Sequence, residues 1–130
     1  MSTHSFIGYE TDTGSVVGVY CHYDGYLDGV GYVLKKHYTD PAKIKALVEL
    51  GSLSSLGSHL GEKHTFTDDV DEKEWTTAYH RDRDDELVIA EYDDMYSITS
   101  GVYEFMYVYM NQGLWMHKND SVNSPWLPLI

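Results

Sequence analysis

The chain has one cysteine and no long apolar run, and each of these shortages excludes a class of protein. Its one cysteine, Cys21, cannot form an internal disulfide or a cysteine-cluster zinc site, which fits a reducing compartment. No apolar run approaches the roughly 20 residues that a membrane helix needs, and residues 1–4 lack the basic and apolar parts of a signal peptide. We therefore expect a cytoplasmic protein without membrane contact.

Basic residues are also scarce. The chain carries 9 lysines and arginines against 21 aspartates and glutamates, for a net charge of −12. Residues 68–94 hold twelve of the carboxylates but only Lys73, Arg81 and Arg83 as basic side chains, so this segment alone contributes −9. Because contacts with a phosphate backbone need clustered lysine and arginine, we expect no direct binding to nucleic acid. The charge favours a partner protein with a basic surface.

The length of 130 residues is enough to bury most of the apolar surface of the unfolded chain in one core. Twelve tyrosines, three tryptophans and three phenylalanines predict an aromatic core in which many hydroxyl groups must find partners. The sequence shows no internal repeat and no low-complexity segment. We therefore expect a single α+β domain over residues 1–130.

Alternating residues near the start of the chain predict a β-hairpin. Two strand-like runs, residues 5–10 and 16–23, flank a turn at residues 11–14 that ends in glycine. In the second run the alternation places Cys21 and His22 on opposite faces. Cys21 is therefore predicted to be a small buried residue rather than a nucleophile paired with the histidine.

Two helices are predicted next. Apolar residues recur at spacings of three and four from Asp28, a suitable N-cap, to Tyr38. A second helix begins at Asp40 and Pro41, which match the preferences of the N-cap and of the first helical position, and ends at Gly51.

The second half of the chain predicts further strands. Residues 103–110 and 114–118 form a second hairpin, joined by a three-residue loop with glycine in the left-handed position. Residues 75–81 have the composition of a strand, and residues 87–90 fit a strand or a loop. The predicted fold class is α+β, with a single antiparallel sheet of about five strands packed against two helices. The other segments are predicted as a surface loop, a charged turn, a short helix and an apolar tail: residues 58–74, 82–85, 93–96 and 124–130.

Motifs of metal and phosphate sites are missing from the sequence. The pair Asp82 and Asp84 lacks the glycine and the distal glutamate of a calcium loop. Residues 25–31 contain three glycines without the spacing of a phosphate loop, and the seven histidines include no His-x-x-x-His pair. We therefore expect no metal and no cofactor.

Two groups of side chains suggest a small-molecule site. Arg81 and Arg83 lie two residues apart on a chain predicted to be extended, so they would point the same way and could clamp a phosphate or a carboxylate. Alternatively, each arginine neutralises nearby carboxylates. His22 shares its strand face with Tyr20, so it lines a pocket or bonds to a loop carbonyl. The full set of candidate ligand-binding residues is Tyr20, His22, Asp24, Tyr79, His80, Arg81 and Arg83.

Five spaced motifs stand out: YCHYDGY at 20–26, HY at 37–38, LGSLSSLG at 50–57, YHRDR at 79–83 and YVY at 107–109. Together they resemble a family of small, largely uncharacterised proteins encoded by bacteriophages and prophages. The resemblance covers the chain from about residue 8 to about residue 118, and Tyr23 stands where the family often has tryptophan. It implies a phage context but no activity. Small acidic phage proteins are frequently antagonists of host defence, including CRISPR inhibitors and nucleic-acid mimics.

These observations lead to three hypotheses. The first is a non-enzymatic, anti-CRISPR-like inhibitor whose carboxylates occupy the basic groove of a host defence protein that handles nucleic acid. The second is a protein that binds a nucleotide-like ligand, and the third is a small hydrolase that uses His22 or His80. The carboxylates assigned to partner binding under the first hypothesis are Asp68, Asp69, Asp71, Glu72, Glu74, Asp82, Asp84, Asp85 and Glu86.

Overall fold

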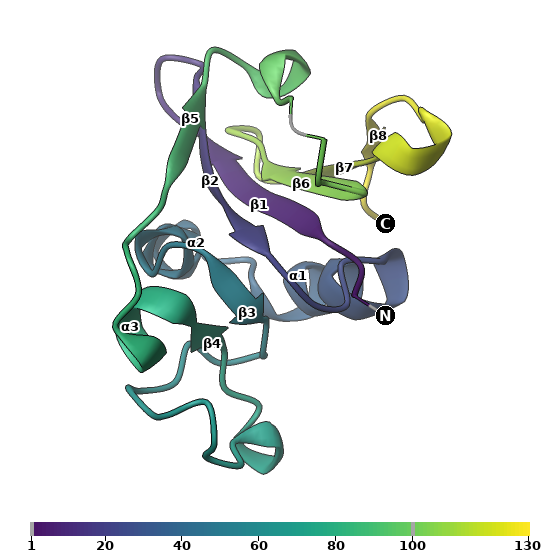
Figure 1. The fold of residues 1–130 in the computed structure, drawn as a ribbon. Helices are drawn as coiled ribbons and strands as arrows, with labels where there is room; N and C mark the ends of the chain where they lie inside the picture. Colours follow the sequence, from purple (N-terminus) through teal and green to yellow (C-terminus); the bar gives the residue numbers. More distant parts are fainter. Residues whose placement is uncertain (1, 100) are drawn as a thin grey trace.

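The computed structural model describes residues 2–99 and 101–130. Their strands join in one mixed sheet in the order β4-β3-β2-β1-β6-β7-β8, and β5 also pairs with β2 (Figure 1). The eight strands of the described residues are β1 Ser5–Glu10, β2 Val16–Cys21, β3 Leu53–Ser55, β4 Thr77–Ala78, β5 Ala90–Tyr92, β6 Phe105–Tyr109, β7 Trp115–Asn119 and β8 Leu127–Pro128.

The helices are short. A π-helical turn, η1 (Leu27–Gly31), runs directly into α1 (Tyr32–His37), and α2 (Pro41–Glu49) follows. A third helix, α3 (Tyr79–Arg83), comes directly after β4. Single 3-10 turns complete the described structure: η2 Asp71–Lys73, η3 Met95–Ser97 and η4 Asp120–Val122.

The prediction of one antiparallel sheet of about five strands on two helices is wrong. The sheet is mixed, because β1 pairs in parallel with β6 and β2 pairs in parallel with β3. These pairings join segments that are far apart in the sequence, so no hairpin turn indicates them. The sequence did not predict β3 and β8, β4 is only part of the strand predicted at residues 75–81, and β5 overlaps residues 87–90 at Ala90 alone. All four strands are two or three residues long, too short to show alternation. A helix, α3, also replaces the end of the predicted strand at residues 75–81.

Both predicted hairpins are present. Strands β1 and β2 pair antiparallel around a turn in which Gly14 has a φ of 89°, and β6 and β7 pair antiparallel around a turn in which Gly113 has the same φ. Glycine tolerates this left-handed conformation without a steric penalty. The tail of the chain returns as β8, which pairs with β7.

The second predicted helix begins where expected. Asp40 accepts a hydrogen bond from the backbone N–H of Ala42 at 3.0 Å, which makes it the N-cap of α2. The first helical segment differs from the prediction, because it starts at Leu27 after Tyr26 and leaves Asp28 inside its first turn. An aspartate in a first turn still interacts favourably with the helix dipole.

The main core lies between the sheet and the helices α1 and α2, which cover one face (Figure 1). Its aromatic members satisfy their polar atoms, as expected for buried tyrosine and tryptophan. The Tyr107 hydroxyl donates to the carbonyl of Gly25 at 2.7 Å, and the indole N–H of Trp115 donates to the carbonyl of Tyr38 at 2.9 Å. These bonds tie β6 and β7 to the helical layer.

A second, smaller core lies on the opposite face of the sheet. Phe6 packs there against residues of β2, β6 and the segment around η3. Gly8 and Gly18 are cross-strand partners beneath the Phe6 ring, and a β-carbon on either glycine would overlap that ring. The glycine pair therefore makes the space that the phenylalanine fills.

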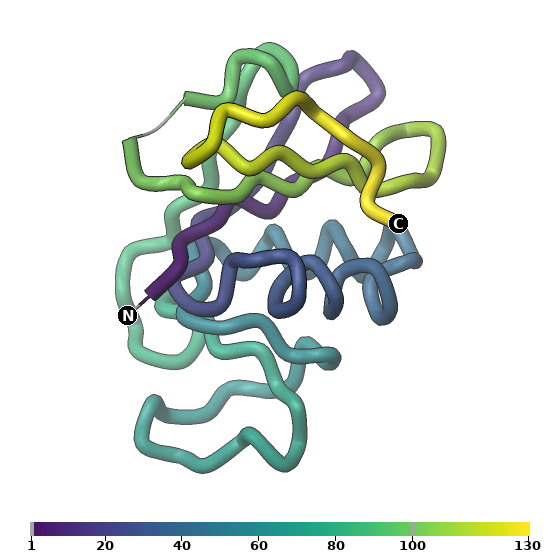
Figure 2. The backbone as a smooth tube through the Cα atoms, turned by 90° about the vertical axis from the view of Figure 1, so that its right-hand side faces the viewer, coloured from purple at the N-terminus to yellow at the C-terminus, as the bar shows by residue number. Residues whose placement is uncertain are grey.

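The long loop between β3 and β4 extends from one end of the sheet. In both views it lies at the bottom, on the side of the molecule away from β6, β7 and β8 (Figures 1 and 2). This loop carries most of the acidic residues that the sequence assigned to partner binding.

Candidate functional site

The acidic segment folds as a lobe at the β3–β4 end of the sheet. We define the acidic lobe as residues 58–86, which comprise the long loop, β4, α3 and the turn after α3. The Tyr38 hydroxyl donates to the carbonyl of Gly57 at 2.7 Å, and Thr76 Oγ1 accepts from the N–H of Gly57 at 3.1 Å. Burial raises the pKa of Tyr38 to about 12, so its hydroxyl keeps the proton that it donates. These bonds attach the base of the lobe to the main core.

Asp82 lies inside the lobe rather than on its surface. The residue is 6 % exposed, and its carboxylate accepts from the backbone N–H groups of Ala78 at 2.8 Å and His64 at 3.1 Å. Arg81 Nε donates to Asp82 Oδ1 at 2.9 Å. Burial by itself raises the pKa of Asp82, but the bonds from Arg81, Ala78 and His64 outweigh it, so the net pKa is below the ordinary value. Asp82 is therefore an internal anchor, not the partner contact that the sequence suggested.

The predicted arginine clamp does not form. The extended conformation expected for this segment is replaced by α3, which separates the two side chains. Arg81 donates to the backbone carbonyls of Leu60 at 2.9 Å and Thr76 at 2.7 Å, so its guanidinium is engaged within the lobe. Arg83 is exposed and lies 2.7 Å from a carboxylate oxygen of Asp85. These contacts fit the alternative prediction, in which each arginine neutralises a neighbouring carboxylate.

The other predicted carboxylates are accessible on the outside of the lobe. Phe66 of the loop contacts the ring of Tyr79 in α3 with centroids 5.5 Å apart, and the Arg83 guanidinium lies over both rings at 4.7 and 4.8 Å. The loop and α3 are thereby joined in one surface. We define the acidic surface as Asp68, Asp69, Asp71, Glu72, Glu74, Asp84, Asp85 and Glu86.

Part of the alternative ligand site gathers at the end of β2. The Tyr20 hydroxyl lies 2.6 Å from Nδ1 of His22, and the ring of His4 stacks on that of His22 with centroids 4.8 Å apart. Burial raises the pKa of Tyr20, and the nearby phenol of Tyr79 raises it further. Asp24, with a φ of 59°, is exposed in the turn after β2. The structure therefore brings Tyr20 and His22 together, whereas Tyr79 packs against Phe66 of the acidic lobe.

Within the described residues, neither histidine proposed for hydrolysis, His22 or His80, contacts an acidic side chain through a hydrogen bond. His80 Nδ1 contacts the backbone carbonyl of Asp85 at 2.8 Å. Burial raises the pKa of Cys21 to about 12, so the neighbouring thiol stays protonated and is a poor nucleophile. This arrangement provides no activated nucleophile in contact with a general base.

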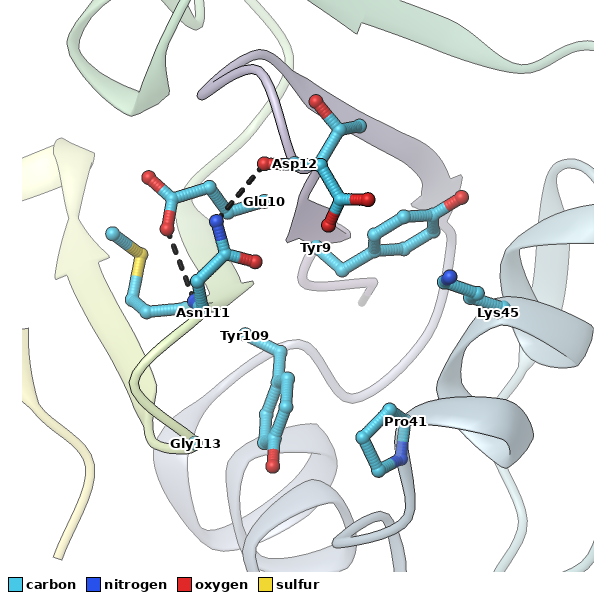
Figure 3. A pocket seen from close by; sticks show the side chains of 10 residues that line it. Tyr9, Glu10, Asp12, Pro41, Lys45, Tyr109, Asn111 and Gly113 are labelled. Carbon is cyan, nitrogen blue, oxygen red and sulfur yellow. Dashed lines mark hydrogen bonds between the residues drawn. The ribbon is translucent and has the colours of Figure 1, made fainter.

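A hollow of about 340 Å³ lies at the turn of the first hairpin, between this turn, the β6–β7 turn and α2 (Figure 3). Tyr9 and Tyr109 border it from paired positions of β1 and β6, and Lys45 Nζ lies 5.9 Å from the ring centroid of Tyr9. The sequence alone does not reveal this site, because the parallel pairing that brings the two tyrosines together is non-local. The only local signal is a tyrosine near the end of each strand.

Among residues 2–99 and 101–130, no group of three or more histidine, cysteine, aspartate or glutamate side chains is placed to hold a metal ion. No helix in the same residues has the length and the apolar character needed to cross a bilayer. Comparisons with protein-family models, with curated proteins and with solved structures found no match for this chain. The resemblance to phage proteins therefore stays a prediction.

Proposed function

We propose that this protein is a non-enzymatic inhibitor that binds a basic surface of another protein through its acidic surface. The observation that carries the proposal is the separation of charge within the acidic lobe. Arg81 and Asp82 neutralise each other inside it, whereas eight carboxylates remain accessible outside. Within the described residues only one of these eight, Asp85, forms an ion pair with a lysine or an arginine.

A basic partner relieves the repulsion among these carboxylates. Carboxylates held close together on one surface repel one another and oppose the compact state. A cationic partner surface attracts each carboxylate and so offsets this repulsion. The same field accelerates encounter, by about tenfold or more in steered associations, and salt screens it over a Debye length of about 8 Å at physiological ionic strength. Binding through the acidic surface therefore weakens as salt is added.

The kind of partner follows from where large basic surfaces occur. Protein grooves that hold a nucleic-acid backbone are lined with lysine and arginine, so an array of carboxylates competes for the same groups. The resemblance to phage proteins adds a context in which such competition is useful. The target under this proposal is a host defence protein that handles nucleic acid, and the place of action is the host cytoplasm.

The proposal is tested with two matched variants. The test variant carries Asp71→Asn, Glu72→Gln, Asp84→Asn and Glu86→Gln, none of which removes a side-chain hydrogen bond of the described structure. The control variant loses four carboxylates outside the acidic lobe and keeps the same net charge as the test variant: Asp28→Asn, Glu49→Gln, Glu91→Gln and Asp120→Asn.

Both variants and the original protein are immobilised and exposed to a bacterial host lysate, and captured proteins are quantified by mass spectrometry. We expect a partner that the original and control proteins retain and that the test variant loses by about tenfold or more, as for steered association. Equal loss of the partner with both variants would show that binding depends on net charge alone, and would reject the acidic surface as the contact. Equal retention by all three would reject it as well.

A second candidate function is favoured by the contact between Tyr20 and His22. Their rings offer stacking surfaces for a nucleotide-like ligand, and the exposed Arg83 is the candidate positive charge. Titration with adenine and guanine nucleotides, followed by the NMR signals of the His22 ring, tests it. Saturable shifts that Arg83→Ala weakens would support this function, and unchanged signals would remove it.

A further inference from the structure

The hollow between the two hairpin turns and α2 has aromatic walls. Tyr9 and Tyr109 are register partners in the parallel pair of β1 and β6, so their side chains leave the same face of the sheet. Figure 3 shows the two rings bordering the hollow, with Pro41 and Lys45 of α2 on its other side. From this geometry we propose that the hollow binds a neutral sugar.

Two hydrogen bonds join the turns that form the rim of the hollow. The backbone N–H of Asn111 donates to Glu10 Oε1 at 3.0 Å, and its side-chain Nδ2 donates to the carbonyl of Thr11 at 3.0 Å (Figure 3). These two bonds tie the β1–β2 turn to the β6–β7 turn, and in the described part of the chain no hydrogen bond engages the amide oxygen of Asn111. A preformed rim lowers the entropy lost on binding.

Several polar groups at the hollow have no hydrogen-bond partner among residues 2–99 and 101–130. In the residues that the structure describes, no hydrogen bond engages the hydroxyls of Tyr9 and Tyr109, the carboxylate of Asp12 or the ammonium of Lys45. The ammonium lies 5.9 Å from the centroid of the Tyr9 ring. The hollow therefore offers one cationic donor, a carboxylate acceptor and two hydroxyls that can do either.

The charges at the hollow disfavour an anion, which would meet the carboxylates of Glu10 and Asp12 in a protein whose net charge is −12. A cation is attracted by these carboxylates but meets the ammonium of Lys45 at the same hollow. A neutral ligand that accepts from Lys45 and donates to a carboxylate uses both kinds of group without meeting a like charge.

The hydroxyl groups of a sugar both donate and accept, which matches the mixed polar groups, and the apolar C–H face of its ring packs on an aromatic side chain. The volume of about 340 Å³ has room for about one or two sugar rings.

The test is an NMR titration of the isotope-labelled full chain. The ligands are glucose, galactose, N-acetylglucosamine and their disaccharides, with adenosine monophosphate as an anionic probe and free lysine methyl ester as a cationic probe. We expect saturable shifts of the backbone amides of Tyr9, Asp12 and Asn111 with at least one sugar and with neither charged probe. Tyr9→Leu should weaken that binding about tenfold, which is about 1.4 kcal/mol.

Two further variants separate binding from folding. Asp12→Ala removes a carboxylate in an exposed turn that makes no side-chain hydrogen bond in the described structure, and it should weaken sugar binding about fivefold. Glu49→Ala, on α2 but outside the hollow, should leave it unchanged. The proposal is overturned if no sugar gives saturable shifts, if the shifts lie elsewhere, if a charged probe binds more tightly at these amides, or if a folded Asp12→Ala protein binds as well as the original.

Discussion

Replacing Asp82 with alanine should destabilise the protein strongly although the residue sits in a run of surface-like charges. The substitution removes the carboxylate that lies 2.9 Å from Arg81 Nε and that accepts from two backbone N–H groups, those of Ala78 and His64. Arg81 cannot simply turn to solvent, because its side chain is 16 % exposed and also donates to two backbone carbonyls of the lobe.

The magnitude follows from these contacts. Removing one partner of a buried, hydrogen-bonded ion pair costs about 3–5 kcal/mol, because the other charge stays buried. Arg81 lies close to the surface, so water reaches it more easily than a deeply buried group. We therefore expect a loss of about 3 kcal/mol from Asp82→Ala, against a total of about 5–15 kcal/mol for a domain.

Equilibrium unfolding in urea, followed by tryptophan fluorescence, measures this loss. Trp75 is a suitable reporter, because its ring lies 5.7 Å from that of His64 in the same lobe. Asp84→Asn is the control, since Asp84 is exposed with a left-handed φ of 60° that asparagine also tolerates, and it should change stability by less than about 0.5 kcal/mol. A loss below about 1 kcal/mol for Asp82→Ala would refute the role of Asp82 as an internal anchor.

The other predictions concern pH, the thiol and the two cores. Because the pKa of Asp82 is lowered in the folded protein, its stabilisation is fully present above about pH 4 and is lost as pH falls through the lowered pKa; Asp82→Asn should therefore flatten the acid limb of the free energy of unfolding. Burial raises the pKa of Cys21 to about 12, so a thiol reagent should label it only after unfolding, and rapid labelling of the folded protein would contradict its burial. Gly18→Ala should lower stability by about 1–3 kcal/mol in thermal unfolding, because the added methyl overlaps Phe6. Tyr107→Phe should cost about 1 kcal/mol in the same assay by leaving a backbone carbonyl without its donor, and no change would show that water replaces it.

Local signals predicted the parts of the fold that local chemistry determines. The turn glycines Gly14 and Gly113 indicate the two hairpins, and Asp40 with Pro41 marks the start of α2. The sheet as a whole was not predictable in this way, because its parallel pairs join strands without a turn between them. The strands of two or three residues add backbone pairing to the sheet but are too short to show an alternation of apolar and polar side chains.

The candidate site shows the same division between local and non-local information. The sequence does not distinguish the four residues of the run at 81–84, which simply alternate in charge: Arg81, Asp82, Arg83 and Asp84. The structure separates them, because the long loop folds back onto the first two: Arg81 donates to the carbonyl of Leu60, and Asp82 accepts from the N–H of His64. Arg83 and Asp84 stay exposed. Burial of one pair of charges therefore depends on a loop about twenty residues away, and nothing in the segment itself indicates it.

The hollow bordered by Tyr9 and Tyr109 depends on non-local pairing even more. Each tyrosine alone is an ordinary strand residue, and Lys45 alone is an exposed residue of a helix. They form a site only because β1 and β6 are neighbours and α2 packs across their ends.

Native mass spectrometry of the tagged protein recovered from a bacterial host lysate tests the acidic surface most directly. The sample is recovered at low salt and again at high salt. We expect a protein-sized adduct at low salt that is lost at high salt, since screening removes the attraction between the acidic surface and a basic partner. A small adduct that survives high salt, or no adduct under either condition, would contradict the proposed inhibitor.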